Sequence, residues 1–215
     1  MYEKLIRGLA DNRRIIGRSR FSSYVVLVPF MFIENEWHIL FQKRAQNIRQ
    51  GGEVSFPGGG YDAAVDNTFA DTAIRETVEE LGIDRGDIKI EGHLGTLVSP
   101  MGAVIDVCIG RILLSDTGSF RLNRDEVEEV FTVPANEFVR MDCEVYTISL
   151  DITPHIKDST GRELAFPARE LGLPKRYQGK WNNVLQQMYI YRTEQGMIWG
   201  LTAEIIRDML ELASE

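Results

Sequence analysis

The chain has 215 residues, of which 44% are hydrophobic, and its 24 basic and 32 acidic residues give a net charge of −8. This length suits one buried core, so we expect a single domain over residues 1–215. The negative charge argues against nonspecific binding to nucleic acid or to anionic membranes. The most apolar run, residues 24–33, is too short to cross a bilayer, and we expect no signal peptide and a cytoplasmic location.

Local patterns predict a mixture of strands and helices. We expect a short helix over residues 2–10, followed by a basic segment that contains Arg13 and Arg14 and continues to Arg20. Apolar runs predict five strands, at residues 24–33, 37–42, 88–97, 105–113 and 127–133. The first two strands flank Glu34-Asn35-Glu36, which predicts a turn and therefore a β-hairpin.

Glycine and proline mark the remaining segments. Gly51-Gly52 and Gly58-Gly59-Gly60 surround Phe56-Pro57 and predict a loop whose backbone amides approach a ligand. Residues 151–183 are polar and interrupted by prolines and glycines, so we expect a long insertion or lid there. Residues 202–213 predict a final amphipathic helix with Thr202 as its N-cap.

The most informative element is the helix that we expect over residues 68–81. Asp66-Asn67-Thr68 offers N-cap side chains, and Gly82 can adopt the left-handed conformation that ends a helix. An apolar stripe at helical spacing predicts the buried face, through Ala70, Ile74, Val78 and Leu81.

The other face of this helix carries Glu76, Glu79 and Glu80 beside Arg75. Steps of three and four residues place the three carboxylates on one side, where like charges repel one another. A solvated helix gains nothing from this arrangement unless a cation lies among the carboxylates. A hard divalent cation such as Mg²⁺ would supply that charge, so the cluster predicts a metal site.

Residues Arg75 to Ile83 resemble the motif of the Nudix hydrolases, Gly-x5-Glu-x7-Arg-Glu-U-x-Glu-Glu-x-Gly-U, where U is a bulky aliphatic residue. Thr77 replaces an aliphatic residue but is also β-branched. The first half departs further, because the chain has Gly60-x5-Asp66-x8-Arg75. The resemblance transfers the role of the first glutamate to Asp66, and it leaves Asp62 and Asp66 open between metal contact and helix capping.

A second block resembles the coenzyme A pyrophosphatases of this family, whose motif is Leu-Leu-Thr-x-Arg-Ser/Ala-x3-Arg-x3-Gly-x3-Phe-Pro-Gly-Gly. The corresponding residues here are Leu40-Phe41-Gln42-Lys43-Arg44-Ala45, Arg49, Gly52 and Phe56-Pro57-Gly58-Gly59. The interval from Arg49 to Gly52 is one residue short. Near the C-terminus, Ile198 to Ala203 resembles the closing Trp-Gly-x-Thr-Ala of the same branch.

The resemblance implies an α/β fold, the Nudix α/β/α sandwich with a mixed sheet, and a site that holds Mg²⁺ or Mn²⁺. It implies hydrolysis of the diphosphate of coenzyme A or its derivatives to 3′,5′-ADP and 4′-phosphopantetheine, and it suggests a homodimer. Within the same enzyme class, the alternative substrates are ADP-ribose or NADH. A catalytically silent nucleotide sensor is the alternative from another class.

These considerations assign roles to individual residues. Glu76, Glu79 and Glu80 are the expected metal ligands, and Arg75 is expected to orient a carboxylate through a bidentate ion pair. Either Glu79 or a glutamate from a later loop takes the proton from the attacking water. The later candidates are Glu126, Glu128 and Glu129, with Glu129 the first choice.

The alternation of valine and acid around these later glutamates is explained somewhat better by the solvated face of a strand. For the substrate phosphates we expect contacts from Arg44, Arg49 and the backbone of Gly58 and Gly59. Lys43 is a weaker candidate for the same role.

Overall fold

The computed structural model describes residues 15–214, so the helix expected at residues 2–10 and the basic pair Arg13-Arg14 lie outside the described residues. The centre of the fold is a seven-stranded mixed sheet in the order β3-β2-β1-β6-β5, with β4 paired to β1 and β7 paired to β2. Its strands are β1 (Ser22–Ile33), β2 (Glu36–Arg44), β3 (Val54–Ser55), β4 (Gly58–Gly60), β5 (Ile88–Ser99), β6 (Ala103–Ile112) and β7 (Val127–Pro134). All five predicted strands are confirmed.

Strands β1 and β2 form the predicted hairpin, with Ile33 opposite Glu36. The two residues between them, Glu34 and Asn35, have φ angles of 48° and 67°. Two left-handed residues in succession make the tight turn whose twist matches that of a hairpin. The central strands β1 and β6 are parallel, whereas the other paired strands of this sheet are antiparallel.

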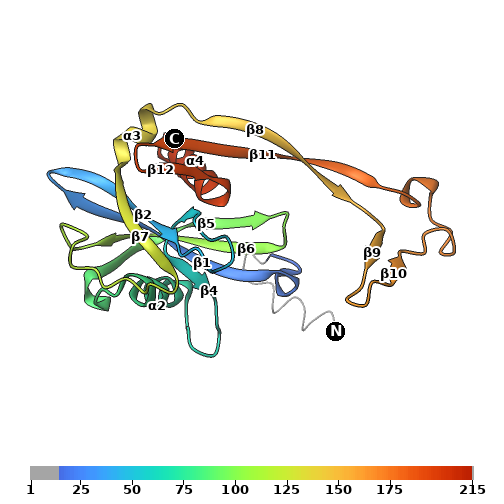
Figure 1. The fold of residues 1–215 in the computed structure, drawn as a ribbon, viewed down its shortest axis with the longest axis horizontal. Coiled ribbons are helices and arrows are strands. Elements are labelled where there is room, and N and C mark those ends of the chain that lie inside the picture. Colours follow the sequence, from blue (N-terminus) through green and yellow to red (C-terminus); the bar gives the residue numbers. More distant parts are fainter. Residues whose placement is uncertain (1–14, 215) are drawn as a thin grey trace, which may run out of the picture.

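Two helices cover opposite faces of this sheet, α2 (Phe69–Leu81) and α4 (Gly200–Ala213) (Figure 1). Alternation along the strands divides the core into two clusters. Leu27 and Leu40 belong to the cluster beneath α2, whereas Val28 and Phe41 belong to the cluster beneath α4. The sheet between two helical layers confirms the predicted α/β/α sandwich. Within residues 15–214, no helix is long and apolar enough to cross a bilayer.

Helix α2 begins at Phe69, one residue after the predicted start, and it ends at Leu81 with Gly82 as its C-cap, as predicted. The Thr68 hydroxyl accepts a hydrogen bond from the Asp71 amide (3.2 Å), and the Asp71 carboxylate accepts one from the Thr68 amide (3.0 Å). This reciprocal pair is a capping box. At the other end, Gly82 adopts the left-handed conformation with φ 62°.

The predicted buried face of α2 is confirmed in part, because Ile74 and Val78 pack against the cluster beneath α2, but the fully buried residues are mostly different ones. Of the expected stripe, only Leu81 is buried, whereas Ala70, Ile74 and Val78 are half-buried. The buried residues of this helix are Thr72, Ala73, Thr77, Glu80 and Leu81. The hydropathy pattern did not assign Thr72, Thr77 and Glu80 to the buried face. These residues can be buried because their polar groups form hydrogen bonds inside the fold. For example, the Thr77 hydroxyl donates to the Ala73 carbonyl (2.6 Å).

Two local predictions are wrong. Gly58-Gly59-Gly60 does not form a loop, because it is strand β4 and pairs with Tyr24, Val25 and Val26 of β1. Thr202 does not cap the last helix, because α4 begins at Gly200. The Thr202 hydroxyl instead donates to the Val54 carbonyl (3.1 Å), which connects α4 to β3.

The segment after β7 has more regular structure than its composition predicts. A short helix α3 (Ala135–Arg140) leads into a second sheet with the strand order β12-β11-β8. Its strands are β8 (Glu144–Ile152), β11 (Trp181–Thr193) and β12 (Gly196–Trp199). Strands β8 and β11 extend away from the rest of the protein as a long ribbon, which we call the arm, and the hairpin of β9 (His155–Lys157) and β10 (Glu163–Ala165) lies at its far end (Figure 1).

Gly82 offers a test of how the end of α2 is fixed. An alanine at this position would force a left-handed conformation on a residue with a Cβ, and that Cβ would overlap the Arg121 carbonyl. We expect Gly82→Ala to lower the free energy of unfolding by about 1 kcal/mol or more. Gly86→Ala is the matched control, because its Cβ would have open space, and we expect a change within about 0.5 kcal/mol. Urea unfolding measures both, and equal values for the two variants would contradict this account.

Candidate active site

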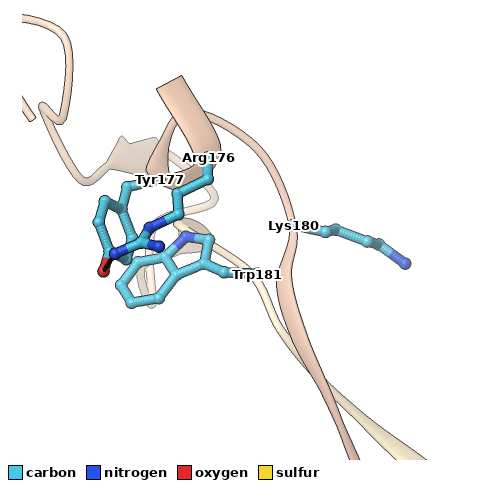
Figure 2. A pocket seen from close by; sticks show the side chains of 4 residues that line it. All are labelled: Arg176, Tyr177, Lys180 and Trp181. Atoms are coloured by element: carbon cyan, nitrogen blue, oxygen red, sulfur yellow. Dashed lines mark hydrogen bonds between the residues drawn. The ribbon is translucent and has the colours of Figure 1, made fainter. Parts of the chain in front are cut away.

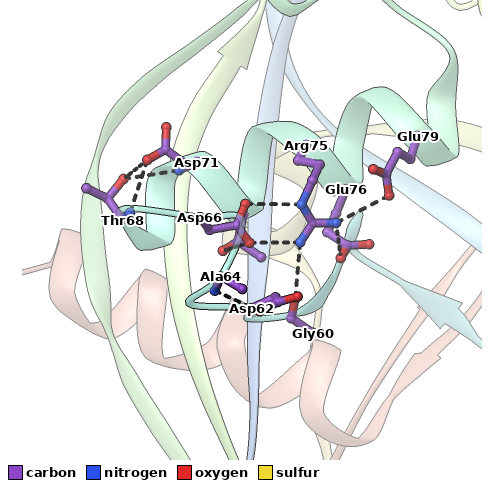
Figure 3. A network of polar contacts seen from close by, with 10 residues as sticks. Gly60, Asp62, Ala64, Asp66, Thr68, Asp71, Arg75, Glu76 and Glu79 are labelled. Carbon is purple, nitrogen blue, oxygen red and sulfur yellow. Dashed lines mark hydrogen bonds and ion pairs between the residues drawn. The ribbon is translucent and has the colours of Figure 1, made fainter.

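The Arg75 guanidinium connects the acidic face of α2 to the segment that precedes the helix (Figure 3). Nε and Nη2 donate to both oxygens of the Asp66 carboxylate (3.1 and 2.9 Å). Nη1 donates to Glu76 (2.7 Å) and to Glu79 (3.3 Å), and Nη2 also donates to the Gly60 carbonyl (3.2 Å). The expected bidentate pair is therefore made with Asp66, while single bonds orient Glu76 and Glu79.

Asp66 has a different role from either of the two that we considered. It is buried, accepts a further hydrogen bond from the Thr72 hydroxyl (2.8 Å), and has its pKa lowered to about 2, chiefly by the hydrogen bonds from Arg75. Both of its oxygens accept hydrogen bonds from Arg75, so it positions that guanidinium, and Thr68 is the residue that caps the helix. Asp62 accepts a hydrogen bond from the Ala64 amide (2.9 Å), which stabilises the turn before Asp66.

Glu80 is the buried carboxylate of the cluster, with only 4% of its surface exposed. Its two oxygens accept hydrogen bonds from Gln42 Nε2 (2.8 Å) and from the Gly58 amide (2.9 Å). Burial raises the pKa of Glu80 to about 7, and repulsion from Glu76 and Glu126 adds to that shift. The Gly58 amide thus binds Glu80, so it is not free to contact a substrate as predicted.

Glu76 depends on the glycine at position 59. A Cβ at Gly59 would overlap the Glu76 carboxylate, so the missing side chain provides the space for this acid. Burial raises the pKa of Glu76, Arg75 opposes the shift, and the charges of Glu79 and Glu126 add to it. Glu79 is the accessible member of the set, with 54% of its side chain exposed.

Among the later glutamates, Glu126 is the one whose charge acts on the helix. It raises the pKa of both Glu76 and Glu80. The loop that contains it is anchored to the C-terminal end of α2, where the Asn123 amide donates to the Glu80 carbonyl (2.9 Å). The amide of Ala45 also donates to the Glu126 carbonyl (2.9 Å).

Glu129, the first choice from sequence, lies elsewhere. It is opposite Lys43 across β7 and β2, and the two side chains form an ion pair (3.3 Å). Two residues further along, Phe131 stacks on Phe41 in the cluster beneath α4. Alternation therefore places Glu129 on the α4 face of the sheet, opposite to α2.

The basic residues before β3 differ in whether an acidic side chain neutralises them. Lys43 is occupied by Glu128 (3.0 Å) as well as by Glu129. Arg44 Nε donates to the Arg49 carbonyl (3.2 Å), and Arg49 is exposed. Within residues 15–214, neither Arg44 nor Arg49 has a carboxylate at ion-pair distance, so both guanidinium groups are available to an anion.

Gln42 is a site residue that the sequence analysis missed. It is fully buried, it donates to Glu80, and its Oε1 has no hydrogen-bond partner in the described part of the chain. The sequence feature that could have identified Gln42 is its position directly after the apolar residues Leu40 and Phe41 of a predicted strand. A buried amide at that point requires a polar partner, which α2 provides.

The donor set fits a hard divalent cation. In the described residues, no three acidic, histidine or cysteine side chains converge closely enough to hold a metal, because Glu76 and Glu79 contact Arg75 while Glu80 contacts Gln42. However, burial and mutual repulsion raise the pKa of Glu76 and Glu80, and carboxylate oxygens are the ligands that Mg²⁺ and Mn²⁺ prefer. A cation among them would offset that repulsion.

The family model described as NUDIX domain matches residues 24–149, which is more than half of the chain. The chain belongs to the NUDIX family. This confirms the resemblance carried by the residues of α2. The match begins within β1, contains β2 to β7 and α2, and ends within β8 of the arm.

Several relatives of this NUDIX chain are named for their activity. Human mitochondrial coenzyme A diphosphatase NUDT8 is 34% identical over 132 residues, which is 60% of this chain and 56% of the relative. Mouse peroxisomal coenzyme A diphosphatase NUDT7 is 34% identical over 119 residues, 55% of this chain and 49% of the relative. The chain spans about half the length of these relatives. Nudix hydrolase NudL of Yersinia enterocolitica, named as uncharacterized, is 29% identical and is matched over 86% of this chain and 78% of the relative.

Similar solved structures include a MutT/nudix family protein from Enterococcus faecalis. Its TM-score is 0.47 at 14% identity, and the match covers 100% of this chain and 70% of that chain. A Caenorhabditis elegans Ap4A hydrolase complex has a TM-score of 0.44 at 18% identity, with 54% of this chain and 83% of that chain covered.

The ion pair of Asp66 and Arg75 gives a pH-dependent prediction. The pKa of Asp66 is lowered from 3.8 to about 2, so its charged form stabilises the fold above pH 3.8, and this contribution is lost as the pH falls towards 2. We expect Asp66→Asn to lower the free energy of unfolding by about 1–3 kcal/mol at pH 7. The difference from the unmodified protein should shrink as the pH falls.

Urea unfolding at a series of pH values measures this effect. Asp62→Asn is the control, because an asparagine keeps the side-chain oxygen that accepts the Ala64 amide. A difference for Asp66→Asn that stays constant from pH 7 to pH 2 would show that the ion pair does not stabilise the fold.

Proposed function

We propose that this protein hydrolyses the diphosphate bond of coenzyme A or one of its derivatives in a metal-dependent reaction. The observation that carries the proposal is the acidic cluster of Glu76, Glu79, Glu80 and Glu126, which contains more negative charge than Arg75 offsets. Two of the relatives are named coenzyme A diphosphatases. The proposed products are 3′,5′-ADP and 4′-phosphopantetheine, or its acylated form.

The residues of this chain can be given separate parts in the reaction. Glu76, Glu79 and Glu80 would hold Mg²⁺ or Mn²⁺, which neutralises phosphate oxygens and lowers the pKa of bound water. Arg75 is a positioning residue, because all of its donors are directed at protein oxygens. Glu79 is exposed and can accept the proton of the attacking water, and Glu126 is the alternative from a later loop.

The substrate phosphates meet a different set of groups. A diphosphate requires compensation of its charge, and the unpaired guanidinium groups of Arg44 and Arg49 can supply it. Both residues lie in or just after β2, the strand that also provides Gln42. We propose that they bind phosphate groups of the substrate, whereas Lys43 is retained by its two glutamates.

ADP-ribose or NADH remains the alternative within the enzyme class, since a divalent cation held by the acidic cluster would promote attack of water on other diphosphates as well. A sensor without catalysis is the alternative from another class. The presence of all three motif carboxylates disfavours the sensor, because nucleotide binding alone does not require an acidic side chain buried at position 80.

A substrate comparison tests the proposal. Coenzyme A, dephospho-coenzyme A, ADP-ribose and NADH are each incubated with the protein, with and without Mg²⁺ or Mn²⁺, and the products are identified by mass spectrometry. We expect metal-dependent release of 3′,5′-ADP that is fastest from coenzyme A. We expect Glu79→Gln to reduce the rate at least about 100-fold, because it removes a metal ligand and a proton acceptor.

The outcomes of this comparison separate the alternatives. Faster cleavage of ADP-ribose or NADH would support diphosphate hydrolysis but would show that coenzyme A is not the preferred substrate. Absence of turnover with all four compounds would favour the sensor. Undiminished hydrolysis by Glu79→Gln would show that α2 is not the catalytic element.

A pair of glycine variants tests the geometry of Glu76. In Gly59→Ala, the new methyl group displaces the Glu76 carboxylate, which is the flexible end of a side chain, so the fold is retained. We expect kcat to fall about 10- to 100-fold, because small displacements of catalytic groups have effects of this size. Gly60→Ala is the control, since its Cβ would meet open space, and its kcat should stay close to that of the unmodified protein. Equal kcat values in the two variants would show that the position of the Glu76 carboxylate does not affect catalysis.

A further inference from the structure

Gln42 holds one oxygen of the Glu80 carboxylate from inside the sheet. The backbone of Gln42 lies between β3 and β7, where it pairs with Ser55 and Val130, so its position is fixed on both sides. The side chain is fully buried, and its Nε2 donates to Glu80 Oε1 (2.8 Å). Of the two orientations of an amide, only the one that turns Nε2 towards Glu80 gives the carboxylate a donor. The contact therefore holds the amide in one orientation.

The carbonyl oxygen of the same amide has no hydrogen-bond partner in the described part of the chain. Four buried side-chain polar atoms share this property there, and two of them, Gln42 Oε1 and Ser55 Oγ, belong to residues that lie opposite each other across β2 and β3. The other two lie elsewhere. His38 is near the opposite end of β2, and Trp181 is beside Tyr177 near the far end of the arm (Figure 2). Unpaired polar atoms are thus concentrated next to Glu80.

An amide at position 42 is unfavourable for packing alone. A buried carbonyl oxygen without a partner lowers stability, because it loses hydrogen bonds to water and gains none. Leu40 belongs to the core cluster beneath α2, and strand alternation places Gln42 on the same face of β2. An apolar residue would therefore suit this position equally well, apart from the contact with Glu80. Departures of this kind from good packing are expected where a structure serves a functional site.

Glu80 is held from two strands. Gln42 of β2 binds Oε1, and the Gly58 amide of β4 binds Oε2 (2.9 Å). One donor on each oxygen fixes the plane of the carboxylate and leaves further lone pairs for another partner. Both donors are neutral, so they orient the carboxylate without cancelling the charge that attracts a cation.

We propose that Gln42 is a positioning residue that orients Glu80 as a ligand for the divalent cation of the proposed reaction. This inference rests on the proposed function, because it gives Gln42 a role only through the metal site. Without the amide, Oε1 has no donor, and the charges of Glu76 and Glu126, which act on Glu80, turn its carboxylate away from the cluster. The cation then loses a ligand that is already in place before it binds.

Binding of Mn²⁺ to the full chain tests this proposal, measured without substrate from the electron paramagnetic resonance signal of the free ion. We expect Gln42→Met to weaken Mn²⁺ binding about 10- to 100-fold, which is the usual effect of removing the partner of a metal ligand. Ser55→Ala is the matched control. It removes the neighbouring hydroxyl, which has no hydrogen-bond partner in the described residues, so Mn²⁺ affinity should equal that of the unmodified protein.

A double variant distinguishes positioning from a general loss of structure. If Gln42 acts through Glu80, Gln42→Met should weaken Mn²⁺ binding no further when Glu80 is already replaced in Glu80→Gln. Circular dichroism checks that each variant is folded. Gln42→Asn, whose amide is one methylene shorter and does not reach Glu80, replaces Gln42→Met if the latter is unfolded. Raising the Mn²⁺ concentration should restore hydrolysis of coenzyme A by Gln42→Met, whereas a misfolded site would not recover.

The outcomes separate this inference from the proposed function. Absence of Mn²⁺ binding by the unmodified protein would overturn both. Equal Mn²⁺ affinities of the unmodified protein and Gln42→Met, or further weakening of Glu80→Gln by the second substitution, would overturn the role of Gln42 and leave the metal-dependent reaction intact.

Discussion

The guanidinium of Arg75 is the interaction on which the geometry of the acidic cluster depends. Two of its hydrogen bonds fix Asp66 before the helix, one reaches the Gly60 carbonyl of β4, and two hold Glu76 and Glu79 on the helix itself. A planar group with five donors can make all of these contacts at once, whereas an ammonium group has three donors and no fixed fork. The helix, the strand and the intervening turn therefore have one common point of attachment.

This attachment leaves an excess of negative charge. Arg75 carries one positive charge, and the carboxylates of Asp66, Glu76 and Glu79 all contact it. Glu80 receives only neutral donors, from Gln42 and Gly58, and the charge of Glu126 acts on it as well. Burial without a cation disfavours the charged form of such a group, which is why its pKa rises. A divalent cation would reverse this effect and would also make an acidic protein attractive to an anionic substrate.

The parts of this arrangement that depend on neighbouring residues in the chain could be predicted from the sequence. The capping box of Thr68, the left-handed Gly82 and the spacing of the glutamates are all local properties of α2. The buried face of α2 was not predictable in the same way, because Glu80 is buried only where Gln42 and the Gly58 amide meet it. Those partners come from β2 and β4, and hydropathy alone assigns a glutamate to the surface.

The other differences between the sequence-based predictions and the structure arise from contacts between residues far apart in the chain. Glu126 and Glu129 are three residues apart and equivalent by composition, but the pairing of β7 with β2 places Glu129 beside Lys43, while the hydrogen bond from Asn123 to α2 brings the loop of Glu126 to the cluster. The arm shows the same limit on a larger scale. Prolines and glycines between residues 151 and 183 indicate turns correctly, yet the pairing of Glu144–Ile152 with a strand about 30 residues later is a tertiary property. Once that pairing is known, strand alternation places Tyr146, Ile148 and Ile152 on one side, where the isolated sequence shows only scattered apolar residues in a polar segment.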